Sequence, residues 1–308
     1  MKILVTGGAG FIGSHLVRQL LKNNFEVAVL DNLSSGTKKN LPAEINFAEM
    51  DIRDEKFSKF VEKEKFDAAV HLAGQTMVNK SVQYPKFDAD VNVIGTINLL
   101  EAAKKFSVRR IVFASTAAVY GDVDEKILPI KESQPLNPMS FYALSKMTAE
   151  NYLKLYSELF GLEFIALRFS NVYGEFQGDG GEGGVISIFS KLAAQKKQPT
   201  IFGDGLQTRD FIHAEDISKG ICAALTTENK NFACNLSTQT EINLNELVKI
   251  LSKAAGYEIF PTYQARRQGD IKRSSLSNEK SRKILNWKPK ISLLEGLQRT
   301  YKYFCAES

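Results

Sequence analysis

Two short stretches of the chain carry the side chains best suited to chemistry. Tyr142 and Lys146 are four residues apart in a segment with helical spacing, so their phenol and ammonium groups would share one helix face. Because a neighbouring positive charge favours a phenolate, we expect Lys146 to lower the pKa of Tyr142 from about 10 toward neutrality. Such a tyrosine can accept a proton from an alcohol and later return it. The alternative for this pair is ordinary exposed helix surface.

Thr116 offers a hydroxyl close to the same chemistry. It ends the apolar run 110–116, and substrates of open α/β sheets bind at the carboxyl ends of strands. We therefore expect its hydroxyl to bind a substrate oxygen. The alternative is that it hydrogen-bonds the backbone of the following loop.

A dinucleotide site is predicted at the start of the chain. The apolar run 3–5 is followed by Gly7, Gly10 and Gly13 and then by helical spacing. A strand that turns on glycine into a helix presents free backbone N–H groups to a pyrophosphate. The next strand ends in Asp31, 18 residues after Gly13. A carboxylate there accepts hydrogen bonds from ribose hydroxyls and repels a 2′-phosphate, so NAD is expected and not NADP.

Alternating strands and helices must position these groups. Near-continuous apolar strands joined by helices indicate a parallel sheet that is covered on both faces. The sequence therefore predicts a Rossmann-type doubly wound α/β fold. The expected strands are 3–5, 25–30, 45–48, 66–72, 110–116 and 163–169, and the main expected helices are 11–23, 87–105 and 140–160.

The pattern changes beyond Asn171. A glycine-rich stretch, 174–184, is interpreted as a mobile loop. Helical segments and short strands follow, among them a strand at 258–260. We expect an NAD-binding Rossmann domain of residues 1–172 with about 206–236. A smaller α/β lobe, about 173–205 and 237–308, would bind the substrate.

Composition excludes several classes of protein. The chain has 308 residues, 44% hydrophobic and 24% charged, with a net charge of +5, as in ordinary globular proteins. Its lysine pairs are not interleaved with aromatic residues, which argues against nucleic-acid binding. No apolar stretch is long enough to span a membrane. Three widely spaced cysteines and three histidines without ligand spacing predict a cytoplasmic protein without disulfides or a metal site.

Together these motifs resemble the extended short-chain dehydrogenase/reductase family, in its NAD-dependent epimerase/dehydratase branch that acts on nucleotide sugars. The resemblance runs from Met1 to about Leu297, through segments such as TGGAGFIGSH, FASTAAVYG, YALSK and IFGDGLQTRDFIHAEDIS. It implies a catalytic trio of Thr116, Tyr142 and Lys146 and a tightly held NAD. The implied NAD contacts are Gly7, Gly10, Phe11, Ile12, Gly13, Asp31, Asn32, Gly36, Asp51, Ile52, Leu72, Ala73, Gln75, Asn92, Tyr142 and Lys146.

The resemblance also implies a site for a nucleotide diphosphate sugar. Permanently charged arginines suit a pyrophosphate, and an aromatic ring suits a base. The alternatives are surface ion pairs for the arginines and an ordinary core ring for Phe202. The implied substrate contacts are Thr116, Tyr142, Asn171, Gly184, Val185, Phe202, Arg209, Arg267, Asp270 and Ser274.

The residues after Thr116 distinguish among activities of the branch. Related dehydratases and decarboxylases carry carboxylates there, whereas this chain has Ala117 and Ala118. The resemblance therefore favours a UDP-hexose 4-epimerase that works through a transient 4-keto sugar. The small Ser274 favours acceptance of 2-acetamido sugars as well. Many relatives have Pro-Arg after the Asn-Val-Tyr-Gly stretch, whereas here Gly174 is followed by Glu175 and Phe176. The loss of that cation makes a uronate a poorer substrate.

Other activities stay open. They are UDP-glucuronate 4-epimerase, a nucleotide-sugar dehydratase or reductase, and a non-catalytic NAD-binding regulator. Relatives pair the helices that correspond to 87–105 and 142–160 across a two-fold axis, so the resemblance also implies a homodimer.

Overall fold

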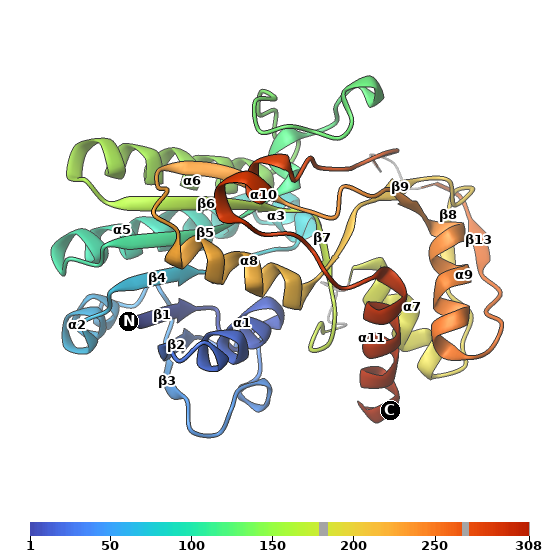
Figure 1. Cartoon of the computed structure of the whole chain (residues 1–308), viewed down its shortest axis with the longest axis horizontal. Helices are drawn as coiled ribbons and strands as arrows, with labels where there is room; N and C mark the ends of the chain where they lie inside the picture. Colours follow the sequence, from blue (N-terminus) through green and yellow to red (C-terminus); the bar gives the residue numbers. More distant parts are fainter. Residues whose placement is uncertain (179–183, 267–270, 308) are drawn as a thin grey trace.

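A seven-stranded parallel sheet dominates the computed structural model, which describes residues 1–178, 184–266 and 271–307 (Figure 1). The strand order is β3-β2-β1-β4-β5-β6-β11, and helices cover both faces. The expected Rossmann-type fold is confirmed. The strands are β1 (Lys2–Thr6), β2 (Glu26–Asp31), β3 (Asn46–Glu49), β4 (Ala68–His71), β5 (Arg110–Thr116), β6 (Glu163–Phe169) and β11 (Phe232–Leu236).

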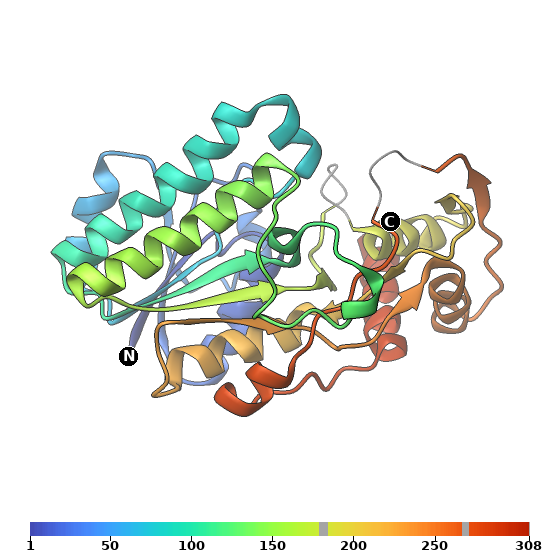
Figure 2. The ribbon, with the colours of Figure 1, turned by 90° about the horizontal axis from the view of Figure 1, so that it is seen from above.

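Two apolar clusters hold the helices on the sheet. On one face α1 (Phe11–Lys22) and α8 (Ala214–Thr226) contribute Leu16, Leu20 and Ile217, all fully buried. On the other face lie α2 (Lys56–Glu64), α5 (Gly95–Lys105) and α6 (Phe141–Phe160). Figure 2 shows α5 and α6 side by side over this face. Burial of both faces explains why the strands read as continuous apolar runs.

Helix α6 begins and ends where its sequence indicates. The Ser140 side chain accepts a hydrogen bond from the Ala143 N–H at 3.1 Å and caps the first turn. Gly161, in the left-handed conformation, ends the helix. These two residues place Tyr142 in the first turn, next to the carboxyl end of the sheet.

The remaining elements form a third apolar cluster outside the sheet, built mainly from α7, α9 and α11. Three small strand pairs accompany it: β7 with β10, β9 with β12, and β8 with β13. The elements are β7 (Asn171–Tyr173), α7 (Val185–Ala194), β8 (Thr200–Phe202), β9 (Thr208–Arg209), β10 (Phe211–His213), β12 (Ile242–Asn243), α9 (Leu244–Ala255), β13 (Thr262–Gln264), α10 (Glu279–Leu285) and α11 (Leu293–Glu307). Short 3-10 turns are η1 (Lys38–Asn40), η3 (Ala117–Tyr120) and η4 (Glu125–Ile127).

The helical segment expected over about 87–105 is confirmed, and it contains a π-helical turn that the sequence did not predict. The structure has α4 (Pro85–Ala89), a π-helical turn η2 (Asp90–Ile94) and then α5, and it adds α3 (Val78–Gln83) before them. The π turn carries Asn92, whose side chain hydrogen-bonds both the N–H and the C=O of Gln75. These tertiary contacts accompany the wider turn, as is common at functional sites.

The strand expected at 258–260 is wrong, because the structure places the strand β13 at Thr262–Gln264. Residues 262–264 pair in parallel with β8, which sets the register. The Ile259 N–H instead bonds the Ser252 hydroxyl at 3.1 Å, so it is held by α9. An apolar run alone cannot place a strand that pairs with a segment 62 residues away.

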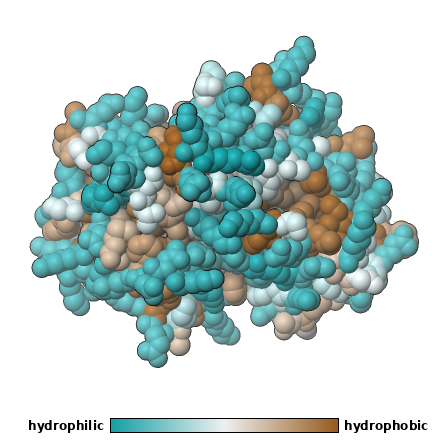
Figure 3. Space-filling view, viewed as in Figure 1, coloured by the Kyte–Doolittle hydropathy of each residue, from teal (hydrophilic) through white to brown (hydrophobic). Residues whose placement is uncertain are grey.

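The face shown in Figure 3 is largely hydrophilic, and its most hydrophobic patch lies on the right, over the smaller part of the molecule. None of the described helices is long and apolar enough to cross a membrane.

Candidate active site

The proposed catalytic residues meet at the carboxyl edge of the sheet. Thr116 is the last residue of β5, and its hydroxyl oxygen accepts a hydrogen bond from the Ala118 N–H at 3.2 Å. Lys146 is buried and donates from Nζ to the Ala114 carbonyl at 3.0 Å. The Thr116 hydroxyl lies close enough to the Tyr142 phenol to lower its pKa. Thr116 therefore both caps the following turn and faces the tyrosine.

The electrostatics of the pair differ from expectation. The surrounding protein desolvates the phenol and raises the pKa of Tyr142 to about 12, which outweighs the Thr116 hydroxyl and is reinforced by Asp88. Burial lowers the pKa of Lys146 to about 8, while Asp88 opposes that shift. The prediction that Lys146 lowers the pKa of Tyr142 toward neutrality is thus wrong for the ligand-free protein. For both groups desolvation is the largest cause of the shift, and it disfavours the phenolate and the ammonium alike.

The glycine turn fits a dinucleotide. Gly7 has φ +72°, and a Cβ atom there would lie 2.6 Å from the Ala73 nitrogen. A Cβ atom on Gly13 would lie 2.3 Å from the Gly7 carbonyl oxygen, so the helix packs directly on the turn. Gly10 precedes α1 and meets only the Gly7 oxygen, at 3.3 Å, among the described residues. The start of α1, with Phe11 and Ile12, therefore has room for a pyrophosphate on its backbone N–H groups.

Asp31 lies beside this turn. Its carboxylate accepts hydrogen bonds from the Ala9 N–H at 2.9 Å and the Leu33 N–H at 2.8 Å. Burial raises its pKa, although these backbone donors oppose the shift. The Gly10 N–H acts on it as well, and because a carboxylate has about four acceptor positions, it retains capacity for a ribose hydroxyl. Gly36 packs closely against the glycine turn, since a Cβ atom there would lie 2.6 Å from the Ala9 carbonyl carbon.

Asp51 follows β3 at the same edge. Asn32 donates to it at 2.7 Å, and Arg53 binds it through Nε at 2.8 Å. The Arg53 guanidinium lowers the pKa of Asp51 to about 2. Ile52 is buried in the apolar cluster under α5, close to Gly95. Asp51 is therefore a fixed negative charge at the rim of the crevice.

The residues after β4 form a buried polar network. Leu72 and Ala73 pack against Gly7. The Gln75 side chain donates to Asp88 at 2.6 Å, and Asn92 donates to the Ser145 hydroxyl at 3.0 Å. This network joins β4, η2 and α6 around Lys146.

Asp88 belongs to this network, although it was not predicted from the sequence as a site residue. It is 1% exposed, and its Oδ2 has no hydrogen-bond partner among the described residues. Its spacing of four residues before Asn92 was the available signal. A single acidic residue in an apparently amphipathic helix gives no reason to expect burial.

Three of the substrate candidates, Asn171, Arg209 and Ser274, lie on segments that backbone hydrogen bonds of neighbouring residues join. The Asn171 N–H donates to the Asp210 carbonyl at 2.9 Å, next to Arg209. The Thr208 N–H donates to the Lys272 carbonyl at 3.0 Å, which brings β9 beside the segment that leads to Ser274. Phe202 ends β8 and is half-buried.

The other substrate candidates divide into two groups. Gly184 precedes α7, and Val185 is its first residue and packs on the third cluster. Arg267 and Asp270, as well as residues 179–183 of the expected mobile loop, lie outside the described residues.

Glu175 is not exposed to a substrate as a free charge. Arg299 on α11 donates to its Oε1 at 2.9 Å, and His213 Nε2 lies 3.0 Å from its Oε2. Burial raises its pKa, but His213 and Arg299 together lower it to about 2. The His15 ring contacts its carbonyl at 2.9 Å. Glu175 thus joins α1, β10 and α11.

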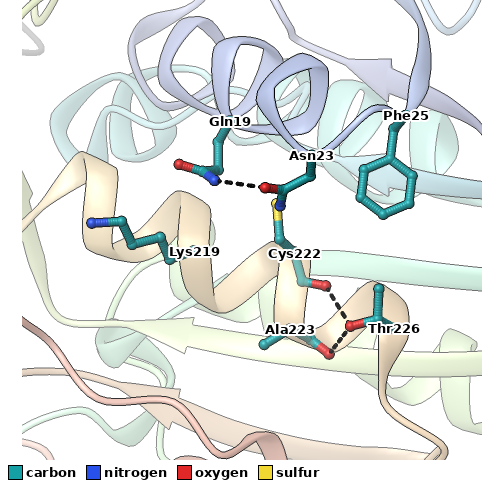
Figure 4. Close-up of a pocket in the computed structure, with 7 residues that line it drawn as sticks. All are labelled: Gln19, Asn23, Phe25, Lys219, Cys222, Ala223 and Thr226. Carbon is teal, nitrogen blue, oxygen red and sulfur yellow. Dashed lines mark hydrogen bonds between the residues drawn. The ribbon is translucent and has the colours of Figure 1, made fainter.

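A hollow of about 450 Å³ lies away from this edge, between α1 and α8 (Figure 4). Its polar groups already bond one another, since Gln19 donates to Asn23 and Thr226 to the Cys222 carbonyl. It therefore offers no catalytic arrangement. Among the described residues, no group of His, Cys, Asp or Glu could hold a metal ion.

Comparisons with known proteins agree with this geometry. The model of the NAD dependent epimerase/dehydratase family matches residues 3–236. A UDP-glucose 4-epimerase of Mycolicibacterium smegmatis is 38% identical over 310 residues, covering 99% of this chain and 98% of the relative.

Two solved structures extend the likeness. One is a UDP-glucose 4-epimerase of Thermotoga maritima with UDP-glucose, with TM-score 0.95, 38% identity and coverage of 100% and 99% of the two chains. The other is a UDP-N-acetylglucosamine 4-epimerase of Methanobrevibacter ruminantium in complex with UDP-N-acetylmuramic acid, with TM-score 0.94, 32% identity and coverage of 100% and 99%.

Proposed function

The chain belongs to the NAD dependent epimerase/dehydratase family, and from this premise we propose that it is an NAD-dependent UDP-hexose 4-epimerase that interconverts UDP-glucose and UDP-galactose. The observation that carries the proposal is the meeting of Thr116, Tyr142 and Lys146 with the glycine turn at one edge of the sheet. The likeness to UDP-glucose 4-epimerases over nearly the whole chain supports it.

In this reaction the residues of the chain move one proton and hold one oxygen. Tyr142 accepts the proton of the sugar 4-hydroxyl and returns it after inversion. Thr116 hydrogen-bonds the same oxygen. Lys146, with a pKa of about 8, is mostly charged at neutral pH and offsets the negative charge of the phenolate. NAD held by the glycine turn and Asp31 would supply the hydride chemistry at carbon 4, and its oxidised ring would add a positive charge that favours the phenolate of Tyr142.

The residues after Thr116 support epimerisation and not elimination of water. Ala117 and Ala118 begin the η3 turn, and their methyl groups cannot transfer protons at neighbouring sugar carbons. The 4-keto sugar therefore has one fate, which is to turn about its link to the diphosphate and receive hydride on its other face. This requires a firm hold on the nucleotide and a loose hold on the sugar.

We assign that hold to the smaller lobe. Residues 1–172 with about 206–236 would bind NAD, and about 173–205 with 237–308 would bind the nucleotide. Arg209 and Arg267 would hold the diphosphate, Phe202 the base, and Asn171, Gly184, Val185 and Asp270 the remaining nucleotide groups. The backbone contacts that link Asn171, Arg209 and the Ser274 segment support this assignment.

Substrate range is expected to include UDP-N-acetylhexosamines. Ser274 is small and partly exposed, and a solved relative with 32% identity is a UDP-N-acetylglucosamine 4-epimerase. UDP-glucuronate is the second candidate substrate. Arg299 is already paired with Glu175, so it is not available to bind the carboxylate of a uronate. The three free cysteines fit a cytoplasmic enzyme.

We also propose a homodimer formed through α4, η2, α5 and α6. These neighbouring helices expose large apolar side chains, among them Phe87, Ile94, Leu155 and Leu159 at 39%, 47%, 48% and 64%. Exposed apolar patches of this kind mark association surfaces, and one surface that meets its own copy gives a closed pair. Light scattering of the purified protein and of Leu159→Glu tests this, with a dimer and a monomer as the expected results.

The decisive experiment uses the purified protein without added cofactor. It is incubated separately with UDP-glucose, UDP-N-acetylglucosamine and UDP-glucuronate, and the products are resolved by NMR. We expect the 4-epimers of the first two sugars and no accumulation of reduced cofactor. A 4-keto-6-deoxy or reduced product, or no turnover with bound NAD, would point to a dehydratase, a reductase or a regulator.

A further inference from the structure

Helix α6 carries a third ionisable residue on its catalytic face. Glu150 follows Lys146 by four residues and Tyr142 by eight, so all three project from the same side of the helix. The side chain of Glu150 is 9% exposed. An acidic side chain is rarely buried without a specific partner.

Glu150 binds the next-to-last residues of two adjacent strands, β5 and β6. The Ser115 hydroxyl donates to its Oε1 at 2.5 Å. Arg168 donates to the same oxygen from Nε at 3.0 Å and to Oε2 from Nη2 at 2.6 Å. Ser115 and Arg168 are partners in the register of β5 and β6. One carboxylate therefore fastens α6 to both strands at their carboxyl ends.

Three consecutive residues at the end of β5 either contact α6 or supply the proposed catalytic hydroxyl. The Ala114 carbonyl holds Lys146, the Ser115 side chain holds Glu150, and the next residue is Thr116. Any sliding of α6 along β5 would break the Glu150 contacts and move Tyr142 relative to Thr116. A displacement of about 1 Å in a catalytic group is enough to lower a rate by about 100-fold.

The far side of Arg168 is fixed as well. It donates from Nη1 to the Tyr120 hydroxyl at 2.9 Å, and Tyr120 donates to Asn235 Oδ1 at 2.7 Å. Asn235 in turn donates to the carbonyls of Ile130 and Ser277. A buried network whose members are all satisfied favours one arrangement.

We propose that the Glu150–Arg168 pair is a positioning device that sets Tyr142 and Lys146 opposite Thr116 for the epimerase reaction. The pair acts through α6 and touches neither substrate nor NAD. The proposal rests on the proposed function, because its main readout is turnover of UDP-glucose.

The same two strands provide a matched control at their other ends. Glu163 of β6 accepts from Arg110 of β5 at 3.0 Å and 2.9 Å, and that pair is also largely buried. It lies at the amino ends of the strands, away from the catalytic trio. Glu163→Gln removes a carboxylate that pairs with Arg110 and also with Arg109 and Lys230, so it breaks at least as many ion pairs as Glu150→Gln. Only Glu150→Gln removes a contact to the catalytic helix.

The test measures kcat and KM for UDP-glucose and amide hydrogen exchange of residues 141–150 in the NAD-bound protein. For Glu150→Gln we expect kcat to fall by about 10- to 100-fold, KM to stay within about threefold, and exchange in 141–150 to accelerate. For Glu163→Gln we expect kcat within about twofold of wild type and slow exchange in 141–150. Equal losses in both variants, or a normal kcat in Glu150→Gln, would overturn the proposal.

A milder variant covers failure of Glu150→Gln to fold. Ser115→Ala removes one hydrogen bond and leaves the ion pair, so we expect kcat to fall by about threefold to tenfold; a wild-type kcat would then overturn the proposal. If wild-type protein does not convert UDP-glucose, the proposed function fails. The exchange of 141–150 in Glu150→Gln and Glu163→Gln then decides alone whether Glu150 positions the helix.

Discussion

The carboxyl and amino ends of β5 and β6 use the same interaction for different purposes. At the amino ends Arg110 binds Glu163 and also donates to the carbonyls of Ala224 and Thr227 at the end of α8. At the carboxyl ends Arg168 binds Glu150, which belongs to the helix of the proposed catalytic residues. The amino-end pair joins the sheet to the end of α8, whereas the carboxyl-end pair joins the sheet to the helix of the proposed catalytic residues.

The two edges also differ in how their charges affect stability. Glu163 is desolvated, yet Arg110 and Lys230 still bring its pKa below the ordinary value, so its charge is favoured by folding. Lys146 and His71, at the carboxyl edge, have their pKa values lowered to about 8 and about 3 by burial. Folding therefore opposes the charged forms of these two residues at the edge where a ligand would bind, and this is a cost of a preorganised site.

The largest expected effect separates two tyrosines of one helix. Tyr142→Phe removes the proposed base at the carboxyl edge, so kcat for UDP-glucose should fall by about 10²- to 10⁴-fold with bound NAD retained. Tyr156→Phe removes a hydroxyl that donates to Glu101 farther along α6, and it should leave kcat within about twofold. Steady-state kinetics and the absorbance of released cofactor measure both. A Tyr142→Phe variant with a near-normal rate would refute the assignment of the base.

Two glycines with similar φ values give the next contrast. Gly7, with φ +72°, is crowded by the backbone of Ala73 at the carboxyl edge. Gly161, with φ +73° at the amino edge, has open space where a Cβ would lie, with no atom of the described residues within 4 Å. Gly7→Ala should lower the free energy of unfolding by about 3 kcal/mol or more and weaken NAD binding. Gly161→Ala should cost about 1 kcal/mol from backbone strain alone. Denaturant titration checks this, and equal costs would show that the turn is not crowded.

Acid titration distinguishes His71 at the carboxyl edge from Glu163 at the amino edge, because they change the free energy of unfolding in different pH ranges. The folded pKa of His71 is about 3 and its unfolded pKa about 6.5, so the unfolded chain binds more protons between these values. Stability should therefore fall as pH drops below 6.5, by up to about 1.4 kcal/mol per pH unit for this group. His71→Gln should flatten the slope.

The amino-edge pair behaves differently in the same titration. Because the pKa of Glu163 is lowered from 4.5, its contribution is lost only as pH falls below that value. Urea unfolding of NAD-free protein at several pH values gives both slopes. An unchanged slope in His71→Gln between pH 6.5 and 4.5 would contradict the assignment to His71.

The smallest expected change in stability is that of Lys146→Met, which we compare with a second buried cation. Lys146→Met removes a desolvated ammonium and should raise the stability of NAD-free protein by about 1 kcal/mol while abolishing turnover. Arg110→Met should instead destabilise, because it removes the buried partner of Glu163 and a donor shared by three carbonyls at the end of α8. Thermal unfolding of the two variants measures the difference, and a destabilised Lys146→Met protein would argue against the cost assigned to that lysine.

Local patterns were sufficient to predict the sheet and to place most candidate residues at its carboxyl edge. The glycine turn, Asp31 and the run that ends in Thr116 each lie within a few residues of a strand end, and parallel strands bring their carboxyl ends to one edge. The spacing of Tyr142 and Lys146 places both on one face of α6. These features depend on short-range order along the chain, so they can be read without coordinates.

Contacts between distant segments decided the rest. Glu150 accepts a hydrogen bond from Ser115, 35 residues away in the sequence, and Glu175 accepts one from Arg299, 124 residues away. The π turn carries Asn92, which hydrogen-bonds the backbone of Gln75. The same packing reversed the expected direction of the Tyr142 pKa. Sequence alone determined which groups stand at the edge of the sheet. Only the tertiary structure decided their partners and their charge, because burial and pairing depend on segments that meet through folding.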